Sequence, residues 1–394
     1  MEEQLAYALI TPYSLYKSRT GGIIGRLLAY ARLEFVAARM YVFSDALVDA
    51  YQKIICPPGT PAAVEKAWHE YIDESLRQKN PWGYLPRCML LLFRGPDAVR
   101  HLKEDVIGAF TEQPVGDTIR GTYGDFIRDE GGVVRYFQPA VITCPDPKLN
   151  DKHLKLLADY ALSDGGVLTG RIEYDQPNVQ TSLVLIKPDN FERRSHRPGN
   201  IIDTFSLTGL RIVAAKLFNM TVAQGEEFYG PLKALFVEKL KGNVTQEVYR
   251  RLQGTFSFAF TMADAEAVAE RLAERNAVAE FNRIVEYMTG VNPEDVTDPE
   301  ERAAASRAKC LALLYEGPDA LDKIRTVLGS TDPTKAEPGT VRSDFGRDLM
   351  RNGAHASDSP ESADRERGIV SLTETEKDTC DVVQVVHRYL ERRK

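Results

Sequence analysis

The chain contains 394 residues, of which 43% are hydrophobic and 27% are charged, and its formal net charge is −7 at pH 7. This composition is typical of a folded globular protein with roughly two or three domains. The negative charge argues against a nucleic-acid partner, because proteins that bind nucleic acids neutralise phosphate backbones with an excess of Lys and Arg.

The cysteines and the lengths of the apolar runs indicate in which cellular compartment the protein is expected. The five cysteines are scattered and form no CxxC pair, which favours a reduced compartment and argues against structural zinc. The N-terminal residues lack the shape of a signal peptide, and no apolar run reaches the roughly 18 residues of a membrane span. We therefore expect a cytoplasmic protein with no membrane partner.

The clearest feature along the chain is an internal repeat. Five blocks recur in the same order, which predicts two tandem copies of one domain. We place the first copy at residues 1–162, a linker rich in Gly, Asp, Gln and Pro at 163–181, and the second copy at 182–394. The matching blocks are 5–12 (LAYALITP) with 182–188 (SLVLIKP), 21–24 with 198–202, 35–39 with 212–216, 88–97 (CMLLLFRGPD) with 310–319 (CLALLYEGPD), and 118–120 with 340–342.

Each copy alternates strands with helices and closes on a further strand. This alternation predicts an α/β sandwich in which helices cover a sheet. The expected elements of the second copy are a helix near 200–208, a strand at 211–218, a helix from about 225 to 242, a strand at 309–315 and a short helix at 319–327.

The second copy carries extra sequence at about 232–278 and 291–307. The larger insert is helical by pattern: Thr261 can cap a helix whose apolar positions include Val268 and Leu272. Two interpretations stay open. The insert is either a surface helical hairpin or a lid or oligomer contact.

One histidine lies in a distinctive setting. His355 is flanked by small and polar residues, and a helix start follows it, with Ser359 as the N-cap, Pro360 at the first helical position and Glu361 near the positive end of the helix dipole. A neutral imidazole held there can act as a nucleophile toward phosphate near neutral pH.

These blocks resemble the nucleoside diphosphate kinase family. The second copy has the family's motifs in order: 186–189 (IKPD), 213–216 (VAAK), 281–290 (FNRIVEYMTG), 315–317 (YEG), 338–342 (PGTVR) and 351–359 (RNGAHASDS). The resemblance implies a ferredoxin-like sandwich with an antiparallel sheet. It also implies transfer of the γ-phosphate of a nucleoside triphosphate to a nucleoside diphosphate through a phosphohistidine.

The resemblance assigns roles to residues of the second copy. His355 matches the phosphorylated histidine, Glu366 matches the glutamate that hydrogen-bonds its ring, and Ser357 matches a residue bonded to that glutamate. Several fixed cations suit phosphoryl transfer, which depends mainly on positioning and charge stabilisation. The remaining matches are Lys187, Arg325 and Arg342 with phosphate-binding cations, Thr331 with a phosphate-contacting hydroxyl, Asn352 with a ribose contact and Tyr229 with a tyrosine near the histidine.

The same resemblance implies Mg²⁺ as the cofactor. Asp358 matches an acidic residue that reaches the ion through water, and magnesium itself is held largely by nucleotide phosphates. One departure concerns the nucleotide base. The family places an aromatic pair where this chain has Glu280 and Phe281, and Glu280 cannot stack, so Phe281 is the candidate contact.

The first copy lacks the family's chemistry. Thr11 occupies the position of Lys187, Lys103 occupies that of Arg325, and the thirteen-residue step that separates Arg342 from His355 leads from Arg120 to Val133. We expect no phosphohistidine in this copy and a structural role. The copies are expected to form an intrachain pseudo-dimer, which is compatible with a higher homo-oligomer.

The resemblance implies nucleoside tri- and diphosphates as the partners, and three functional hypotheses follow. The first is an active nucleoside diphosphate kinase. The second is a nucleotide-binding regulatory or interaction protein with weak turnover, and the third is a histidine phosphotransferase with a protein acceptor. The chain contains no G-x-x-x-x-G-K-[ST], G-x-G-x-x-G or HExxH motif, so other common nucleotide and metal-hydrolase sites have no support.

Overall fold

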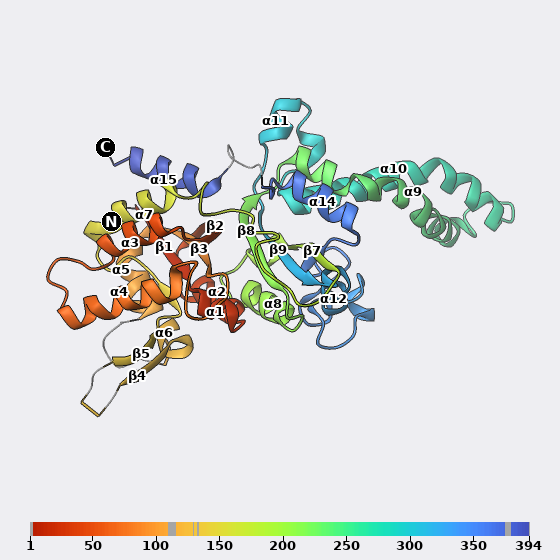
Figure 1. Ribbon diagram of the computed structural model, residues 1–394. Helices are drawn as coiled ribbons and strands as arrows, with labels where there is room; N and C mark the ends of the chain where they lie inside the picture. The colour runs from red at the N-terminus through yellow and green to blue at the C-terminus, as the bar shows by residue number, and fades with distance from the viewer. Residues whose placement is uncertain (1–2, 109–115, 129, 132–133, 375–379, 394) are drawn as a thin grey trace. The chain divides into compact units, whose positions relative to one another are not determined.

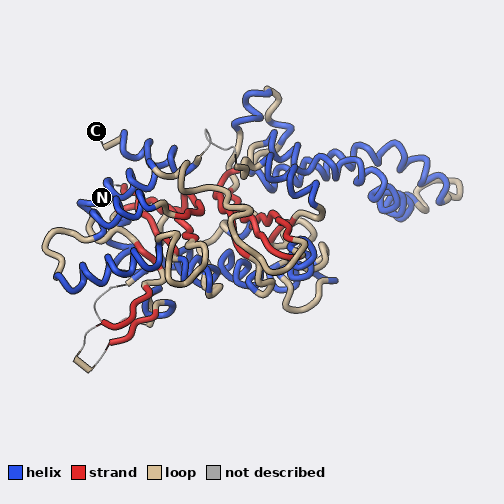
Figure 2. Tube along the Cα trace, viewed as in Figure 1, coloured by secondary structure: helices blue, strands red, loops and turns tan. Residues whose placement is uncertain are grey.

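A computed structural model describes residues 3–108, 116–128, 130–131, 134–374 and 380–393. The chain forms two compact units, the first comprising Met1–Phe218 with Leu311–Lys394 and the second Asn219–Cys310. Figure 1 shows the order of the elements, and Figure 2 shows the strands in red among blue helices.

Two four-stranded sheets of the same topology form the core of the first unit. Their strand orders are β2-β3-β1-β6 and β10-β7-β9-β8, so both sheets follow the ferredoxin-like order in which the first strand lies between the third and the fourth. The registers of β1 with β3 and β6, and of β7 with β9 and β10, are antiparallel. The expected fold class, two tandem ferredoxin-like α/β sandwiches, is confirmed. The strands are β1 (Glu3–Ile10), β2 (Glu34–Val42), β3 (Arg87–Pro96), β6 (Val141–Ile142), β7 (Val179–Ile186), β8 (Arg211–Asn219), β9 (Lys309–Pro318) and β10 (Ala354–Ala356).

In both copies, helices follow the first, third and fourth strands of the sheet, although the two sets of helices are not identical. Those of the first copy are α1 (Pro12–Tyr16), α2 (Thr20–Tyr30), α3 (Asp45–Ile55), α4 (Ala62–Leu76), α5 (Ala98–His101), η1 (Leu102–Ile107), α6 (Ile119–Tyr123), η2 (Pro147–Leu149) and α7 (Asn150–Asp159). Those of the second are η3 (Pro188–Asn190), α8 (Arg197–Ser206), α12 (Ala320–Leu328), η5 (Pro333–Lys335), α13 (Val341–Phe345), α14 (Pro360–Ile369) and α15 (Asp381–Glu391).

The two copies meet where α2 crosses α8 (Figure 1). A Cβ atom on Gly199 would lie 2.3 Å from the carbonyl oxygen of Gly21 and 2.3 Å from the backbone nitrogen of Gly25. Only glycine lets the two helix backbones approach this closely, because any side chain would overlap main-chain atoms that cannot move aside.

The segment expected as a linker, 163–181, pairs with both sheets. The backbone N–H of Gly166 donates to the carbonyl of Met40 in β2, and that of Leu168 donates to the carbonyl of Val213 in β8, both at 2.9 Å. β7 begins at Val179, inside the expected linker. The C-terminal helix α15 packs against α7 and β2, so the end of the chain covers the first copy.

The second unit is a long helical hairpin formed by α9 (Val222–Leu252) and α10 (Met262–Thr289), followed by η4 (Pro293–Asp295) and α11 (Pro299–Ala304). The expectation that the helix stops near 242 is wrong, because α9 continues through Gly242 and packs along α10. Tertiary packing of this kind outweighs the roughly 1 kcal/mol that an interior glycine costs.

Helix α10 begins where the sequence predicted, but its buried face differs from the predicted one. Thr261 caps the helix, and its side chain and that of Asp264 form a capping box. Val268 and Leu272, expected on the apolar face, are 36% and 41% exposed. The buried face is instead a stripe of small side chains four residues apart: Ala265, Ala269, Ala273 and Ala277.

The first copy also has a two-stranded hairpin, β4 (Asp125–Arg128) with β5 (Val134–Gln138). It lies between α6 and β6, where the second copy passes from α13 to β10 without a described hairpin. Across the described part of the chain, no helix combines the length and the apolar character needed to cross a membrane.

Candidate functional site

His355 is the central residue of the short edge strand β10, not of a loop as its flanking residues suggested. The strand pairs His355 with Leu185 of β7, and this register fixes the height of the imidazole along the sheet. Because side chains alternate along a strand, Ala354 and Ala356 pack on the side opposite His355. The histidine side chain keeps 23% of its surface exposed.

Glu366 holds the imidazole in place. Its Oε2 lies 2.9 Å from Nε2 of His355 and accepts a 2.7 Å hydrogen bond from the hydroxyl of Ser357. The carboxylate is 6% exposed, so water competes little for these bonds. Ser359 positions the helix that carries Glu366, because its hydroxyl accepts a hydrogen bond from the backbone N–H of Ser362. A carboxylate in its charged form only accepts, and with such a partner Nε2 donates and the ring's lone pair lies on Nδ1.

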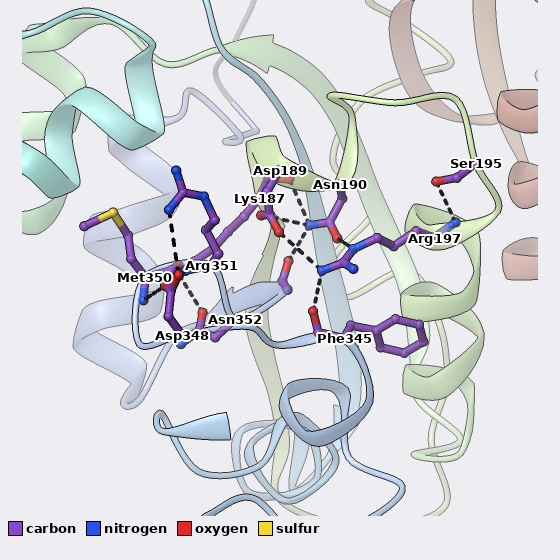
Figure 3. A network of polar contacts seen from close by, with 11 residues as sticks. Lys187, Asp189, Asn190, Ser195, Arg197, Phe345, Asp348, Met350, Arg351 and Asn352 are labelled. Carbon is purple, nitrogen blue, oxygen red and sulfur yellow. Dashed lines mark hydrogen bonds and ion pairs between the residues drawn. The ribbon is translucent and has the colours of Figure 1, made fainter. Parts of the chain in front are cut away.

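Lys187 follows β7 directly and is held by the segment that precedes β10. Its Nζ donates to Oδ1 of Asn352 at 2.7 Å and to the carbonyl of Met350 at 3.0 Å (Figure 3). Asn352 in turn donates to the carbonyls of Thr331 and Leu349, both at 3.1 Å. These contacts fix the ammonium of a buried lysine. Lys187 lies two residues after Leu185, the residue of β7 that pairs with His355.

Asn190 and Arg197 complete this network, and sequence reasoning missed both. Asn190 donates to the carbonyl of Gly353 at 2.7 Å, and Arg197 donates to Oδ1 of Asn190 at 2.6 Å and to the carbonyl of Phe345 (Figure 3). Arg197 also forms a 3.3 Å ion pair with Asp189. The only signal in the sequence was their closeness to the 186–189 motif. Together they fix the turn that precedes the histidine strand.

Two of the expected cations lie on the elements between β9 and β10. Arg325, in the last turn of α12, donates to the carbonyl of Asp358 at 3.2 Å. Arg342, on α13, donates to the carbonyl of Gly329 at 3.0 Å and to the hydroxyl of Thr331 at 3.3 Å. The first contact joins α12 to the end of the histidine strand, and the second joins α13 to the Thr331 loop.

Asp358 is the expected magnesium-side carboxylate. A hydrogen bond from Ser362, together with the nearby Arg325 and His355, holds the pKa of Asp358 below its ordinary value. The side chain is exposed and therefore ionised at neutral pH. The described residues contain no group of three or more His, Cys, Asp or Glu side chains placed to bind a metal. One ionised oxygen ligand suits an ion that keeps its waters and is carried by phosphates.

Tyr229 and Phe281 belong to the second unit. Tyr229 lies on α9 and is 6% exposed, and Phe281 lies on α10 and is 4% exposed. The ammonium of Lys233 lies 5.6 Å from the centre of the Phe281 ring. Glu280 forms a 2.8 Å ion pair with Arg283. The parts of Tyr229 and Phe281 in a nucleotide site stay predictions.

Comparisons with known proteins agree with this arrangement. A family model described as nucleoside diphosphate kinase matches residues 180–285 and 299–374. The chain is 31% identical over 188 residues to a nucleoside diphosphate kinase of Pasteurella multocida, covering 48% of this chain and 91% of the relative. It is 29% identical over 203 residues to that of Methanobrevibacter smithii, covering 52% of this chain and 92% of the relative. The chain belongs to the nucleoside diphosphate kinase family.

Among solved structures, the nucleoside diphosphate kinase of Aquifex aeolicus is 27% identical, with 49% of this chain and 94% of that chain covered and a TM-score of 0.31. The NDP kinase of Pyrobaculum aerophilum is 25% identical, with 48% and 94% covered and a TM-score of 0.32. Every candidate site residue of this nucleoside diphosphate kinase family member lies within the segments that the family model matches.

The first copy has lost the histidine and the glutamate. Val133, the position reached by counting from Arg120, lies outside the described residues, and the sheet register corrects the match. Ile142 pairs with Leu9 as His355 pairs with Leu185, so a buried isoleucine replaces the histidine. The count was wrong because the β4–β5 hairpin lengthens the segment before β6.

A histidine occupies the place of the glutamate. His153 follows Ile142 by the same eleven residues that separate Glu366 from His355. It is fully buried: Nδ1 lies 2.8 Å from the Tyr7 hydroxyl, and Nε2 lies 2.8 Å from the carbonyl of Ile54. Burial lowers its pKa to about 4. In the first copy, the positions of the histidine and the glutamate are therefore filled by packed, uncharged side chains.

Arg120 of the first copy keeps the structural contact of its counterpart Arg342. Its guanidinium donates to the carbonyl of Gly108 at 2.8 Å and to that of Val141 at 3.2 Å. Only 8% of the residue is exposed. An arginine enclosed in this way stabilises the loop before β6.

Proposed function

We propose that this protein is an active nucleoside diphosphate kinase that transfers the γ-phosphate of a nucleoside triphosphate to a nucleoside diphosphate through His355. The observation that carries the proposal is the contact of Glu366 with Nε2 of His355. A buried carboxylate on one ring nitrogen directs the lone pair of the other nitrogen outward for attack.

In the first half-reaction, Nδ1 of His355 attacks the γ-phosphorus. The N–P bond forms, the bond from phosphorus to the bridging oxygen breaks, and the nucleoside diphosphate leaves with that oxygen. The ring keeps its proton on Nε2 and becomes positively charged, and the carboxylate of Glu366 stabilises this charge. In the second half-reaction, a terminal oxygen of another nucleoside diphosphate attacks the phosphorus and releases His355.

The cations bind and position the phosphates. Arginine suits bidentate contact with phosphate oxygens, and lysine acts as a point charge. We assign Lys187, Arg325 and Arg342 to this role and Thr331 to a hydroxyl contact. Asn352 is assigned to the ribose and also holds the Lys187 ammonium, so ribose binding and lysine position are coupled.

Magnesium fits as a cofactor brought by the nucleotide. Asp358 would hold it through water, and the ion would neutralise phosphate charge when bound.

We also propose that Tyr229 and Phe281 contribute to the nucleotide site and that the protein is cytoplasmic. Residues 1–162 would act as a structural partner for a catalytic domain at 182–394. The glycine crossing of α2 with α8 supports an intrachain pseudo-dimer.

A labelling experiment tests the proposal. The protein is incubated with ATP labelled at the γ-phosphate and Mg²⁺, and the product is tested for acid-labile phosphate that transfers to added GDP. We expect about one phosphate per chain in the wild type and none in His355→Asn, while His387→Asn on α15 behaves like the wild type.

The same experiment separates the alternatives. Tight ADP binding without label on a folded protein would refute the proposal and favour a nucleotide-binding regulatory protein. The ion pair of Glu280 with Arg283, at the place of a stacking aromatic ring, is the observation that favours this second candidate. Label that moves to protein acceptors but not to GDP would instead identify a protein histidine phosphotransferase.

A further inference from the structure

A cleft lies within the first unit, and none of the candidate catalytic residues lines it. Its volume is about 630 Å³. It is lined by the loop between α4 and β3, by the segment that leads into β7, and by the first residue of β8. Sites for small molecules typically occupy roughly 300–1,000 Å³, so the cleft is large enough for one organic ligand.

The lining of this cleft is strongly cationic. It contains Lys79, Arg87, Arg171 and Arg211 and a single carboxylate, that of Glu173. Within the part of the chain that the structure describes, none of these four cations forms an ion pair within 4.0 Å. A chain of net charge −7 therefore places four cations and a single carboxylate around this cleft. Such a concentration attracts an anionic ligand.

Arg87 is the most constrained of the four. It is 7% exposed, and its guanidinium donates to the carbonyl of Ile212. Burial, with repulsion from Arg211, lowers the pKa of Arg87 to about 10, although the Glu316 carboxylate nearby acts in the opposite direction. A bound anion would relieve the repulsion between the two guanidinium groups.

Two tyrosines give the cleft a flat aromatic wall. The rings of Tyr16 and Tyr84 stack with their centres 5.4 Å apart and an angle of 11° between their planes. Tyr16 is 54% exposed, and the guanidinium of Arg211 lies 5.6 Å from its centre. Tyr84 and Arg211 both pack on Tyr16, so a nucleobase would pack beside this aromatic pair while the cations bind the phosphates.

We propose that this cleft binds a nucleoside di- or triphosphate, with its base against Tyr16 and its phosphates near Arg87, Arg171 and Arg211. The cleft is built from the first copy, the connecting segment and the start of β8, so the inference goes beyond the proposed transfer at His355. One chain would hold two nucleotides at different sites.

Equilibrium dialysis with labelled ADP tests this inference. We expect two ADP molecules per wild-type chain. The pair of substitutions Arg171→Ala and Arg211→Ala should weaken one site at least tenfold, while Lys187→Met should weaken the other. Arg388→Ala on α15 removes an exposed arginine elsewhere and should change neither site. Arg87 is left intact because its burial makes a folding defect the expected result.

Tryptophan fluorescence reports the cleft independently. The chain has two tryptophans, and Trp82 lies in the loop that lines the cleft whereas Trp68 is buried in α4. In a Trp68→Phe background, ADP should change the emission of Trp82, and the Arg171/Arg211 substitutions should abolish the change.

Two results would overturn the inference. The first is a single ADP per chain that the arginine substitutions leave unaffected. The second is equal affinity for inorganic pyrophosphate and ADP, because the base would then contribute nothing. Loss of ADP from the arginine variant, together with no effect of Lys187→Met and no phosphohistidine, would support the cleft while refuting the proposed function.

Discussion

Replacing Glu366 by glutamine removes one negative charge from the site while keeping the shape of the side chain. In the wild type, the carboxylate contacts Nε2 of His355 at 2.9 Å and the hydroxyl of Ser357 at 2.7 Å. A hydrogen bond to a charged group contributes about 1.5–3 kcal/mol, compared with about 0.5–1.5 kcal/mol for a neutral one. The glutamine amide also has a donor that can face the histidine and select the wrong tautomer.

The expected loss of transition-state stabilisation is about 1.5–3 kcal/mol, which corresponds to phosphorylation roughly 10 to 150 times slower. A rapid-quench measurement of a single turnover with labelled ATP gives this rate. Glu361→Gln is the matched control, because Glu361 lies on the same helix and is exposed. Phosphorylation of the Glu366 variant at the wild-type rate, or equal slowing by both variants, would refute the reasoning.

Three further predictions concern binding and stability. Lys187→Met should weaken ADP binding about tenfold or more in calorimetry, while the variant still unfolds cooperatively on heating. Unchanged affinity contradicts the assignment. Gly199→Ala should destabilise the fold by at least 1–3 kcal/mol in denaturant unfolding, whereas Gly368→Ala, whose Cβ meets no atom within 4 Å, should be neutral or stabilising; similar effects would contradict the crossing. The pKa of His153 is lowered to about 4, so the unfolded chain binds its proton first and stability falls as pH drops below about 6.5. Between pH 6.5 and 5, His153→Gln should therefore lose about 1.5 kcal/mol less stability than the wild type, and equal losses in the two proteins would count against this.

Several parts of the fold followed from the sequence because their signals are local. The repeated blocks carry buried strands with proline turns, and the helix caps at Thr261 and Ser359 form as their residue types suggest. A cap is decided by a few neighbouring residues. The ferredoxin-like strand order came from the family resemblance, since alternation of strands and helices does not fix which strands pair.

The features that could not be predicted depend on distant contacts. Residues 354–356 form a strand only because β7 offers them hydrogen-bonding partners, and three residues are too few for a visible alternation. The replacement of His355 by Ile142 could not be found by counting, because the β4–β5 hairpin changes the spacing. Asn190 and Arg197 carry no pattern of their own, and their roles appear only when the turn before β10 is folded.

The glycine crossing of α2 with α8 has a thermodynamic consequence. Two separate chains joined by the same contact would dissociate on dilution, because their association depends on concentration. Here residues 163–178 tether the two partners, so their encounter is intramolecular and occurs at a fixed effective concentration. The copy that lacks a counterpart of His355 thus remains next to the copy that carries His355 at any protein concentration.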